Sequence, residues 1–368
     1  MKKIGLIVNP IAGMGGSVGL KGTDGNAYQK SIELGAEPVS PQRMRQFLSH
    51  LDFQIEVKFF VAPQNMGEHL IRSTKFNYET VGSINNEQTS AEDTKKIAEQ
   101  LKEKNIDILI FCGGDGTARD IYDIVDLDIP VLALPSGVKM FSSVFAVNPE
   151  AASEMLEGYI EENLETIEKE VLDIDEEAFR EGKLQSKLYG YLKVPKVEKF
   201  IQGGKQSSKS VKSVKQNKQE IANYVIEKMR KDTLYLLGPG TTVKTISDQL
   251  NIKKALLGID ALFQNKAIAL DINEKQILEL LEDYQNIKII ISPIGGQGFI
   301  FGRGNKQFTP KVIKKVGRDN VLVISTEDKL KGLESLRVDT GDEALDKELK
   351  GFMKVIIGKN QKLMIEVD

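Results

Sequence analysis

The stretch Phe111-Cys112-Gly113-Gly114-Asp115-Gly116-Thr117 follows directly on the apolar run Ile106–Ile110. This order predicts a buried strand that ends at Gly113 and a helix that begins near Thr117. Glycines at the carboxyl end of a strand let phosphate oxygens approach the bare backbone N–H groups. The carboxylate of Asp115 would sit beside such phosphates, either to hold Mg²⁺ or to accept a proton from a hydroxyl that attacks phosphorus. The sequence therefore predicts phosphoryl-transfer chemistry.

Strand and helix patterns alternate over residues 1–148, which we expect to form an N-terminal α/β domain with a Rossmann-like parallel sheet. Helices are expected from Ser40-Pro41 to Leu51, over Asn65–Thr74, and over Thr94–Lys104 after a capping box at Thr89 and Glu92. The expected strands are Lys3–Val8, Ile55–Val61, Thr80–Ser83, Asp107–Phe111 and Val131–Leu134.

Three polar or glycine-bearing loops follow strands of this predicted sheet. They are Asn9-Pro10, Gly113–Thr117 and Pro135-Ser136-Gly137, with Lys139 close behind the last. Ligands of parallel sheets bind beyond the carboxyl ends of the strands, where these loops should converge. Residues 12–36 form an irregular insertion whose first part, residues 12–25, holds six glycines and Lys21; this favours a loop packed near a ligand or a mobile lid over a surface insertion.

The sequence pattern changes after residue 148, and we expect a second, β-rich α+β domain over residues 149–368. Thr166–Ile174 and Leu188–Val194 alternate like antiparallel strands, and Lys196–Gln219 has the composition of a solvated linker. Two further glycine-rich segments follow apolar runs, Gly238–Thr242 and Pro293–Asn305. Both are candidate ligand segments, and Arg303 among the glycines of the second could clamp a phosphate.

The composition is that of an ordinary soluble protein, with 368 residues, 40% hydrophobic and 28% charged. A net charge of −3 gives no basic field for nucleic acid, and no apolar run approaches a membrane span, so we expect neither partner. The single cysteine, Cys112, fits a reducing compartment and a cytoplasmic location; we read it as a small apolar residue of a buried strand rather than a reactive thiol. The two histidines, His50 and His69, lie outside the glycine-rich segments, which disfavours a Ser–His or Cys–His nucleophile and zinc.

Two common nucleotide motifs are absent from the sequence. The pattern G-x-x-x-x-G-K-[ST] does not occur, since Gly204-Lys205 is followed by Gln206, and G-x-G-x-x-G fails at Gly13–Gly19 and at Gly296–Gly304. A Walker-type nucleotidase or a dehydrogenase is therefore disfavoured.

Gly113–Thr117 on its strand, with Asn9-Pro10 closing the first strand, resembles the superfamily of NAD kinases, diacylglycerol kinases and phosphofructokinases. The segments Leu20–Gly25, Pro135–Met140, Gly238–Thr242 and Pro293–Asn305 are similar to the divergent prokaryotic ATP-NAD kinase-like family, which is related to the acetoin-cluster kinase-like proteins. The likeness spans nearly the whole chain.

This resemblance implies an enzyme that transfers the terminal phosphoryl group of ATP, or of polyphosphate, to the 2′-hydroxyl of NAD, with Mg²⁺ as cofactor. It also implies a homo-oligomer, and it makes Asp115 the essential acid, as base or as metal ligand. The residues expected to contact the nucleotides are Asn9, Gly113, Gly114, Gly116, Thr117, Lys139, Gly238, Gly240, Thr241, Thr242, Gly296, Gly298 and Arg303.

One segment departs from the family pattern. A Gly-Ile-Asn-x-Gly-x-Leu-Gly-Phe segment usually follows the next strand, where this chain has Pro135–Ser142. This leaves open a kinase of the same superfamily that acts on a lipid, sugar or nucleoside, or a nucleotide-binding regulator without catalysis.

Overall fold

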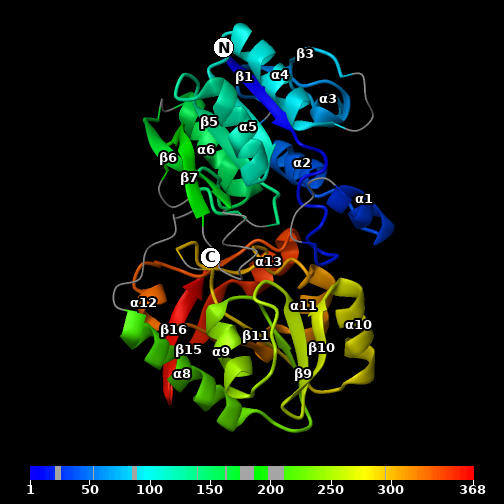
Figure 1. Cartoon of the computed structure of the whole chain (residues 1–368). Coiled ribbons are helices and arrows are strands. Elements are labelled where there is room, and N and C mark those ends of the chain that lie inside the picture. The colour runs from blue at the N-terminus through cyan, green and yellow to red at the C-terminus, as the bar shows by residue number, and fades with distance from the viewer. Residues whose placement is uncertain are drawn as a thin grey trace. The chain divides into compact units, whose positions relative to one another are not determined.

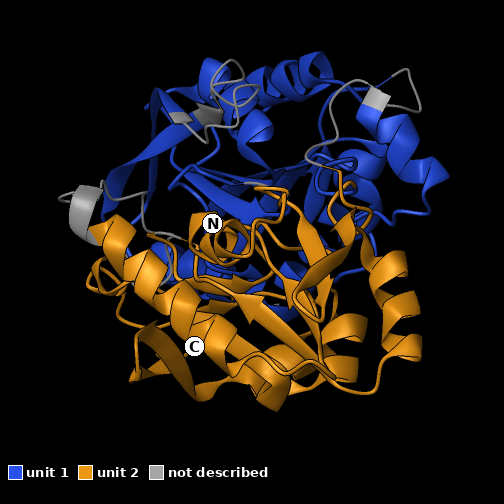
Figure 2. Ribbon diagram, turned by 60° about the horizontal axis from the view of Figure 1, so that its bottom comes forward, with its two compact units in different colours: residues 1–14, 22–204 blue, residues 15–21, 205–368 orange. Residues whose placement is uncertain are grey.

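The computed structural model describes residues 1–20, 26–52, 54–84, 89–138, 140–161, 164–174, 186–197, 211–294 and 296–368. The chain divides into two compact units, which Figure 2 shows in different colours. Unit 1 comprises Met1–Met14 and Gly22–Gly204, and unit 2 comprises Gly15–Lys21 and Lys205–Asp368.

Unit 1 contains a five-stranded parallel sheet in the order β3-β2-β1-β4-β5. Its elements are β1 (Lys2–Val8), α1 (Asn26–Glu33), α2 (Ser40–His50), β2 (Val57–Val61), η1 (Gln64–Met66), α3 (Glu68–Ile71), β3 (Tyr78–Thr80), α4 (Ala91–Glu103), β4 (Ile108–Gly113), α5 (Asp115–Val125), β5 (Val131–Pro135), α6 (Pro149–Glu161), β6 (Thr166–Ile174) and β7 (Ser186–Pro195). This confirms the predicted Rossmann-like N-terminal sheet.

The central strands of this sheet are covered on both faces. Every residue of β4 is buried, as are the last five of β1, which is typical of parallel strands between two helical layers. α2 packs against α6, and α4 packs against α5. Because the strand order reverses at β1, right-handed crossovers place these two pairs on opposite faces of the sheet.

The helix starts differ in detail from the sequence expectation. The capping box before α4 joins Ser90 and Asp93, one residue beyond the predicted Thr89 and Glu92. Ser40 does not cap α2; it is the first helical residue, and its hydroxyl donates into the loops at the sheet edge.

Unit 2 contains a seven-stranded mixed sheet in the order β10-β9-β8-β11-β13-β15-β16. Figure 1 labels five of these strands, β9, β10, β11, β15 and β16. Its four central strands are parallel, and β9, β10 and β16 are antiparallel to their neighbours. The elements are α8 (Val211–Lys228), β8 (Leu234–Leu237), α9 (Thr241–Gln249), β9 (Ile259–Phe263), β10 (Lys266–Ile272), α10 (Glu274–Asp283), β11 (Ile287–Ile291), β12 (Phe299–Phe301), α11 (Pro310–Val316), η3 (Arg318–Asn320), β13 (Val321–Ile324), α12 (Glu327–Leu330), β14 (Arg337–Val338), α13 (Glu343–Leu349), β15 (Gly351–Gly358) and β16 (Gln361–Val367). A β-rich second domain is confirmed.

The core of unit 2 lies on both faces of this sheet. Leu234 and Leu236 of β8 belong to one apolar cluster, while Tyr235 and Leu237 belong to another. This alternation follows from the two-residue period of a strand. Hence β8, like the strands beside it, is covered on two sides.

The division into units falls later than the boundary at 148/149 that the sequence suggested. The antiparallel pair β6–β7, in register from Thr166↔Pro195 to Ile174↔Ser186, belongs to unit 1 because it packs on α5 and β5. Part of the expected Lys196–Gln219 linker, residues 198–210, lies outside the described residues, and α8 begins at Val211. Within the described part of the chain, no helix is long and apolar enough to cross a bilayer.

Candidate active site

The strand order of unit 1 creates a switch point between β1 and β4. From β1 the chain proceeds outward to β2 and β3, and from β4 it proceeds to β5 on the other side. The loops that leave β1 and β4 therefore diverge, and parallel sheets bind ligands in the crevice between such loops. Asn9 follows β1 and Gly114 follows β4, so two sequence-predicted site residues stand at this point.

Asn9 connects the end of β1 to α5 through its side chain and to β4 through its backbone. Its Nδ2 donates to Thr117 Oγ1 at 3.0 Å, and its Oδ1 accepts from the N–H of Ile11 at 3.3 Å. Its own N–H donates to the carbonyl of Cys112 at 2.9 Å. The structure therefore brings Asn9 and Thr117 together, as the sequence suggested, and the hydrogen bonds of Asn9 stabilise the loop that follows β1.

The glycines of the motif have different surroundings. A Cβ on Gly113 would lie 2.4 Å from Thr117 Cβ, and one on Gly137 would lie 2.8 Å from the Cα of Gly114. Such distances are well inside van der Waals contact, so these glycines permit close packing of the loops after β4 and β5. A Cβ on Gly116 would meet only Arg119 Nη2 at 3.6 Å, which leaves the backbone there open to approach.

Asp115 is the first residue of α5, and its side chain is turned toward the chain after β5. One carboxylate oxygen accepts the N–H of Phe141 at 2.7 Å, and the other accepts the N–H of Ser142 at 3.1 Å. The residue is 8% exposed. These two backbone donors fix the orientation of the carboxylate, and they were not foreseen from the sequence.

The N-terminus of α5 carries no side-chain cap. Gly114 is its N-cap residue in an extended conformation, and a glycine has no side chain that could accept a hydrogen bond from the first turn. The first N–H groups of a helix have no partner within the helix, and they carry the positive end of its dipole. This end of α5, beside the open Gly116, has the geometry that binds phosphate.

A buried serine pair supports the same edge and escaped the sequence analysis. Ser40 Oγ donates to the carbonyl of Ala12 at 3.1 Å and lies 2.7 Å from Ser136 Oγ; both serines are fully buried. Gly13, at φ +83°, packs so closely that a Cβ would lie 1.9 Å from the carbonyl oxygen of Ser136. In the sequence, the six glycines of residues 12–25 were the signal of such a close approach.

Cys112 lies in β4 with its side chain fully buried, and its thiol donates to the carbonyl of Ser40 at 3.5 Å. This burial agrees with its interpretation as a packing residue of the strand.

One carboxyl near the site has a perturbed pKa. Burial on α5 raises the pKa of Asp120 to about 6, against the opposing attraction of Lys95 and Arg119. Lys95 itself forms an ion pair with Asp123 at 2.7 Å, which is why it compensates Asp120 only in part.

The glycine-rich turn of unit 2 ends β8 and starts α9. A Cβ on Gly238 would lie 2.9 Å from Ile291 Cγ2, whereas Gly240, at φ +105°, has open space around it. Thr242 is 1% exposed, and its hydroxyl has no hydrogen-bond partner among the described residues. Such an orphaned buried oxygen next to an uncapped helix terminus fits a nucleotide contact.

Two lysines that sequence reasoning missed lie at this turn. Lys218 Nζ donates to Thr241 Oγ1 at 2.9 Å, and burial lowers the pKa of this lysine. Lys254 is buried and donates to the carbonyls of Leu237 and Gly258 and to Asp260 Oδ2. Burial lowers the pKa of Lys254 as well, while Asp260 counteracts the shift.

The third glycine-rich segment is shaped by its backbone. Gly296 and Gly298 have φ of +75° and +78°, and a Cβ on Gly298 would lie 2.9 Å from the carbonyl oxygen of Ser335. Arg303 is 2% exposed, pairs with Asp339 at 3.0 Å, and stacks 4.7 Å from the ring centroid of Phe299. The guanidinium thus already has an anionic partner, which a phosphate would have to share.

Lys139, expected to contact the nucleotides, and Lys21 of the early glycine-rich segment both lie outside the described residues. Within the described ranges, no three His, Cys, Asp or Glu side chains group as a metal site.

The ATP-NAD kinase N-terminal domain model matches residues 4–164, and the ATP-NAD kinase C-terminal domain model matches residues 230–367. The chain belongs to the ATP-NAD kinase family. The two matches together cover more than half of the chain and occur in the order that a two-domain member requires.

Other comparisons add little to this assignment. No curated protein matches this sequence. A solved structure described as an S. aureus MnaA-UDP co-structure is similar at 11% identity with a TM-score of 0.25, covering 93% of this chain and 75% of that one. A similarity this weak supports no conclusion about the fold or the function of this chain.

Proposed function

We propose that this ATP-NAD kinase family member transfers the terminal phosphoryl group of ATP, or of polyphosphate, to the 2′-hydroxyl of NAD and so forms NADP. The observation that carries the proposal is the position of Asp115. Its carboxylate stands at the N-terminus of α5, at the switch point of the sheet, and is oriented by the N–H groups of Phe141 and Ser142.

The reaction needs in-line positioning and neutralisation of charge more than covalent help from the protein. The 2′-oxygen forms a bond to the terminal phosphorus, the bond to the bridging oxygen breaks, and ADP leaves when ATP is the donor. The uncapped N–H groups of α5, reached past Gly116, would hold phosphate oxygens. Donors fixed in advance need no reorganisation when negative charge develops on the transferred group.

Asp115 has two possible roles in this step. As a general base it would take the proton of the attacking hydroxyl on a carboxylate oxygen. As a metal ligand it would hold Mg²⁺, which commonly binds one or two carboxylates together with substrate phosphates. A single carboxylate beside a phosphate-binding helix terminus fits that donor set, and Mg²⁺ when bound supplies charge neutralisation.

The turn Gly238–Thr242 of unit 2 would supply nucleoside contacts. Its support comes from the open space around Gly240 and the orphaned hydroxyl of Thr242. Lys218, which donates to Thr241, would add positive charge to this part of unit 2.

A coupled assay for NADP formation from NAD, ATP and Mg²⁺ tests the proposal directly. Parallel reactions with NADH, diacylglycerol or a sugar as acceptor, and with polyphosphate as donor, identify the substrates. NADP formation that Asp115→Asn suppresses would support the proposal. ATP consumption with another acceptor would identify that compound, in place of NAD, as the substrate. Thermal stabilisation by nucleotide without turnover would indicate a nucleotide-binding regulator.

A further inference from the structure

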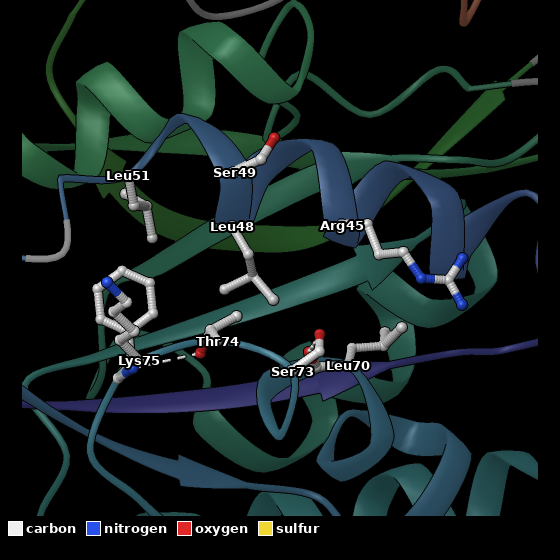
Figure 3. Close-up of a pocket in the computed structure, with 9 residues that line it drawn as sticks. Arg45, Leu48, Ser49, Leu51, Leu70, Ser73, Thr74 and Lys75 are labelled. Carbon is white, nitrogen blue, oxygen red and sulfur yellow. Dashed lines mark hydrogen bonds between the residues drawn. The ribbon is translucent and has the colours of Figure 1, made fainter.

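Unit 1 contains a groove of about 390 Å³ between α2 and the segment 70–76, shown in Figure 3. Leu48 and Phe76 in its lining belong to the hydrophobic core of that unit. The hydroxyls of Ser73 and Thr74 on its wall donate to carbonyls of their own turn. The groove is thus explained by local packing, whereas a polar group that packing does not explain is buried in unit 2.

Lys254 is a buried cation in the chain between α9 and β9. The residue is 7% exposed, and its ammonium group lies 3.2 Å from Oδ2 of Asp260, which is 1% exposed. It is costly to remove an ammonium from water, and burial lowers the pKa of Lys254 while Asp260 opposes the shift. Because apolar side chains in place of a buried ion pair are often neutral or stabilising, stability alone does not account for these two residues.

The Lys254 ammonium binds the backbone on both sides of α9. Besides its ion pair, Nζ donates to the carbonyls of Leu237 at 3.3 Å, Ala255 at 3.1 Å and Gly258 at 3.2 Å. Four oxygens therefore surround a group that has three protons. Leu237 is the last residue of β8, so this contact holds the chain at the point where the glycine-rich turn to α9 begins.

The chain around Lys254 also holds this turn through its own backbone. The N–H of Gly240 donates to the carbonyl of Leu256 at 2.9 Å, and the N–H of Gly238 donates to the carbonyl of Ile290 in β11 at 2.8 Å. No neighbouring atom would lie within 4 Å of a Cβ on Gly240, so side-chain packing does not fix this part of the turn. Its conformation depends instead on hydrogen bonds, and two of them come from the chain around Lys254.

Asp260 in β9 fixes that chain in turn. Its Oδ2 accepts the N–H of Ala255 at 3.1 Å as well as the Lys254 ammonium, and its Oδ1 accepts the N–H of Asp271 in β10 at 2.8 Å. The carboxylate thereby joins the chain around Lys254 to two strands of the sheet. The ammonium has a fixed place as a result, and the carbonyl of Leu237 is held with it.

We propose that Lys254 is a positioning residue for nucleotide binding, whose ammonium sets the backbone conformation in which the turn Gly238–Thr242 contacts the nucleotide. This inference rests on the proposed role of that turn in nucleoside contacts. An ammonium suits the task because its three rotatable donors bond several carbonyls at once, which an apolar side chain cannot do. Loss of Lys254 should therefore weaken nucleotide binding, while the chemical step at Asp115 in unit 1 keeps its rate.

The test needs a variant that removes the ammonium without leaving a buried charge unpaired. Lys254→Met alone would strand the Asp260 carboxylate, so the main variant of the full chain combines Lys254→Met with Asp260→Leu. Calorimetric titration with NAD, and separately with ATP, measures affinity without turnover. We expect the double variant to bind at least one of the two nucleotides about tenfold more weakly than the wild type. The KM for that nucleotide should rise by the same factor, with kcat little changed.

Two controls separate positioning from stability. Lys253→Met, at the exposed neighbour, should bind both nucleotides like the wild type. Leu349→Ala, buried on α13, should destabilise unit 2 and keep the affinity. Circular dichroism and urea unfolding show that each variant is folded and how stable it is. If the double variant does not fold, Lys254→Met is compared with Leu349→Ala, both under conditions in which they are folded.

The proposal is overturned if the variant without Lys254 binds both nucleotides like the wild type, if the wild type binds neither, or if Leu349→Ala weakens binding as much. Nucleotide binding that depends on Lys254, but without NADP formation by the wild type, would support the positioning role and contradict the proposed reaction. The two proposals can therefore fail separately.

Discussion

Asn9 Nδ2 donates a hydrogen bond to Thr117 Oγ1 at 3.0 Å, which ties the end of β1 to the first turn of α5. This bond lies at the point where the sheet order reverses, and it fixes the first turn of α5, the helix terminus that we propose binds phosphate.

Loss of the Asn9–Thr117 hydrogen bond should lower the free energy of unfolding, and the effects of removing it from either end should not be additive. We expect Asn9→Ala to lower the free energy of unfolding by about 1–2 kcal/mol, since it also removes the acceptor of the Ile11 N–H. Thr117→Val removes the same bond from the other side. In a double-mutant cycle by urea unfolding, the two changes should therefore show a coupling of about 1 kcal/mol; strictly additive losses would contradict the assignment.

Asp115→Asn should reduce both turnover and stability. We expect turnover to fall by a factor of about 10²–10⁴, as for a lost general base. The amide also turns one acceptor into a donor that faces a backbone N–H, which should cost about 1–3 kcal/mol of unfolding free energy. Asp120→Asn on the same helix is the control for turnover. A stable Asp115→Asn enzyme with unchanged kinetics would rule out the assigned role.

Three glycines at the candidate site, Gly113, Gly116 and Gly137, should differ in how much stability is lost when each is replaced by alanine. Gly113→Ala and Gly137→Ala place a Cβ 2.4 Å and 2.8 Å from neighbouring atoms, and overpacking of this kind costs about 1–3 kcal/mol. Gly116→Ala meets open space and favours the helix, so its melting temperature should not fall. If phosphate approaches this backbone, Gly116→Ala should nevertheless raise the KM for ATP. Equal losses of stability at all three positions would argue against this distinction.

The pKa of Asp120 gives unfolding a pH dependence with a definite sign. Burial raises this pKa from 3.8 to about 6 in the folded state, so the folded chain binds the extra proton between these values. The contribution to stability is full below about pH 4 and is lost as the pH rises through 6. Because Asp120 is only partly buried, we expect Asp120→Asn to gain about 1 kcal/mol over the wild type at pH 7. Chemical unfolding at pH 4 and 7 checks this, and a gain that persists at pH 4 would contradict it.

Arg303→Met should destabilise unit 2 by about 3–5 kcal/mol, because it leaves Asp339 buried without its cation. The double change Arg303→Met with Asp339→Leu should recover much of this loss. Arg230→Met, at the exposed pair with Asp232, should cost less than about 1 kcal/mol. Urea unfolding measures all three, and a raised KM for ATP with unchanged stability would instead favour a phosphate-binding role for Arg303.

Local patterns in the sequence predicted the frame of the candidate site well. The apolar run before Gly113 and the run before Asn9 correctly indicated strands of one parallel sheet, because buried strands and glycine turns are encoded within a few residues; that the two strands are neighbours came from the structure. The family followed from these segments together with the glycine-rich segments elsewhere in the chain, and the family-model matches confirm it.

What the sequence did not reveal depends on partners far along the chain. The hydroxyl of Ser40 looked like a helix cap, yet it bonds Ser136, 96 residues away. Arg303 looked like a phosphate clamp among glycines, but its ion pair is with Asp339. Such pairings depend on how the elements pack, and a single sequence carries no local signal of them.

The short segment Gly15–Lys21 belongs to unit 2, although the chain on either side of it belongs to unit 1. Within it, the carbonyl of Ser17 accepts the N–H of Glu274, the first residue of α10. A fragment that starts at Lys205 would therefore lack the segment Gly15–Lys21, and the N–H of Glu274 in α10 would lose the carbonyl of Ser17 as its hydrogen-bond acceptor. Expressing the two halves separately should give a C-terminal fragment that is less stable than the same half in the whole chain. A synthetic peptide that covers Gly15–Lys21 should restore the stability of that fragment.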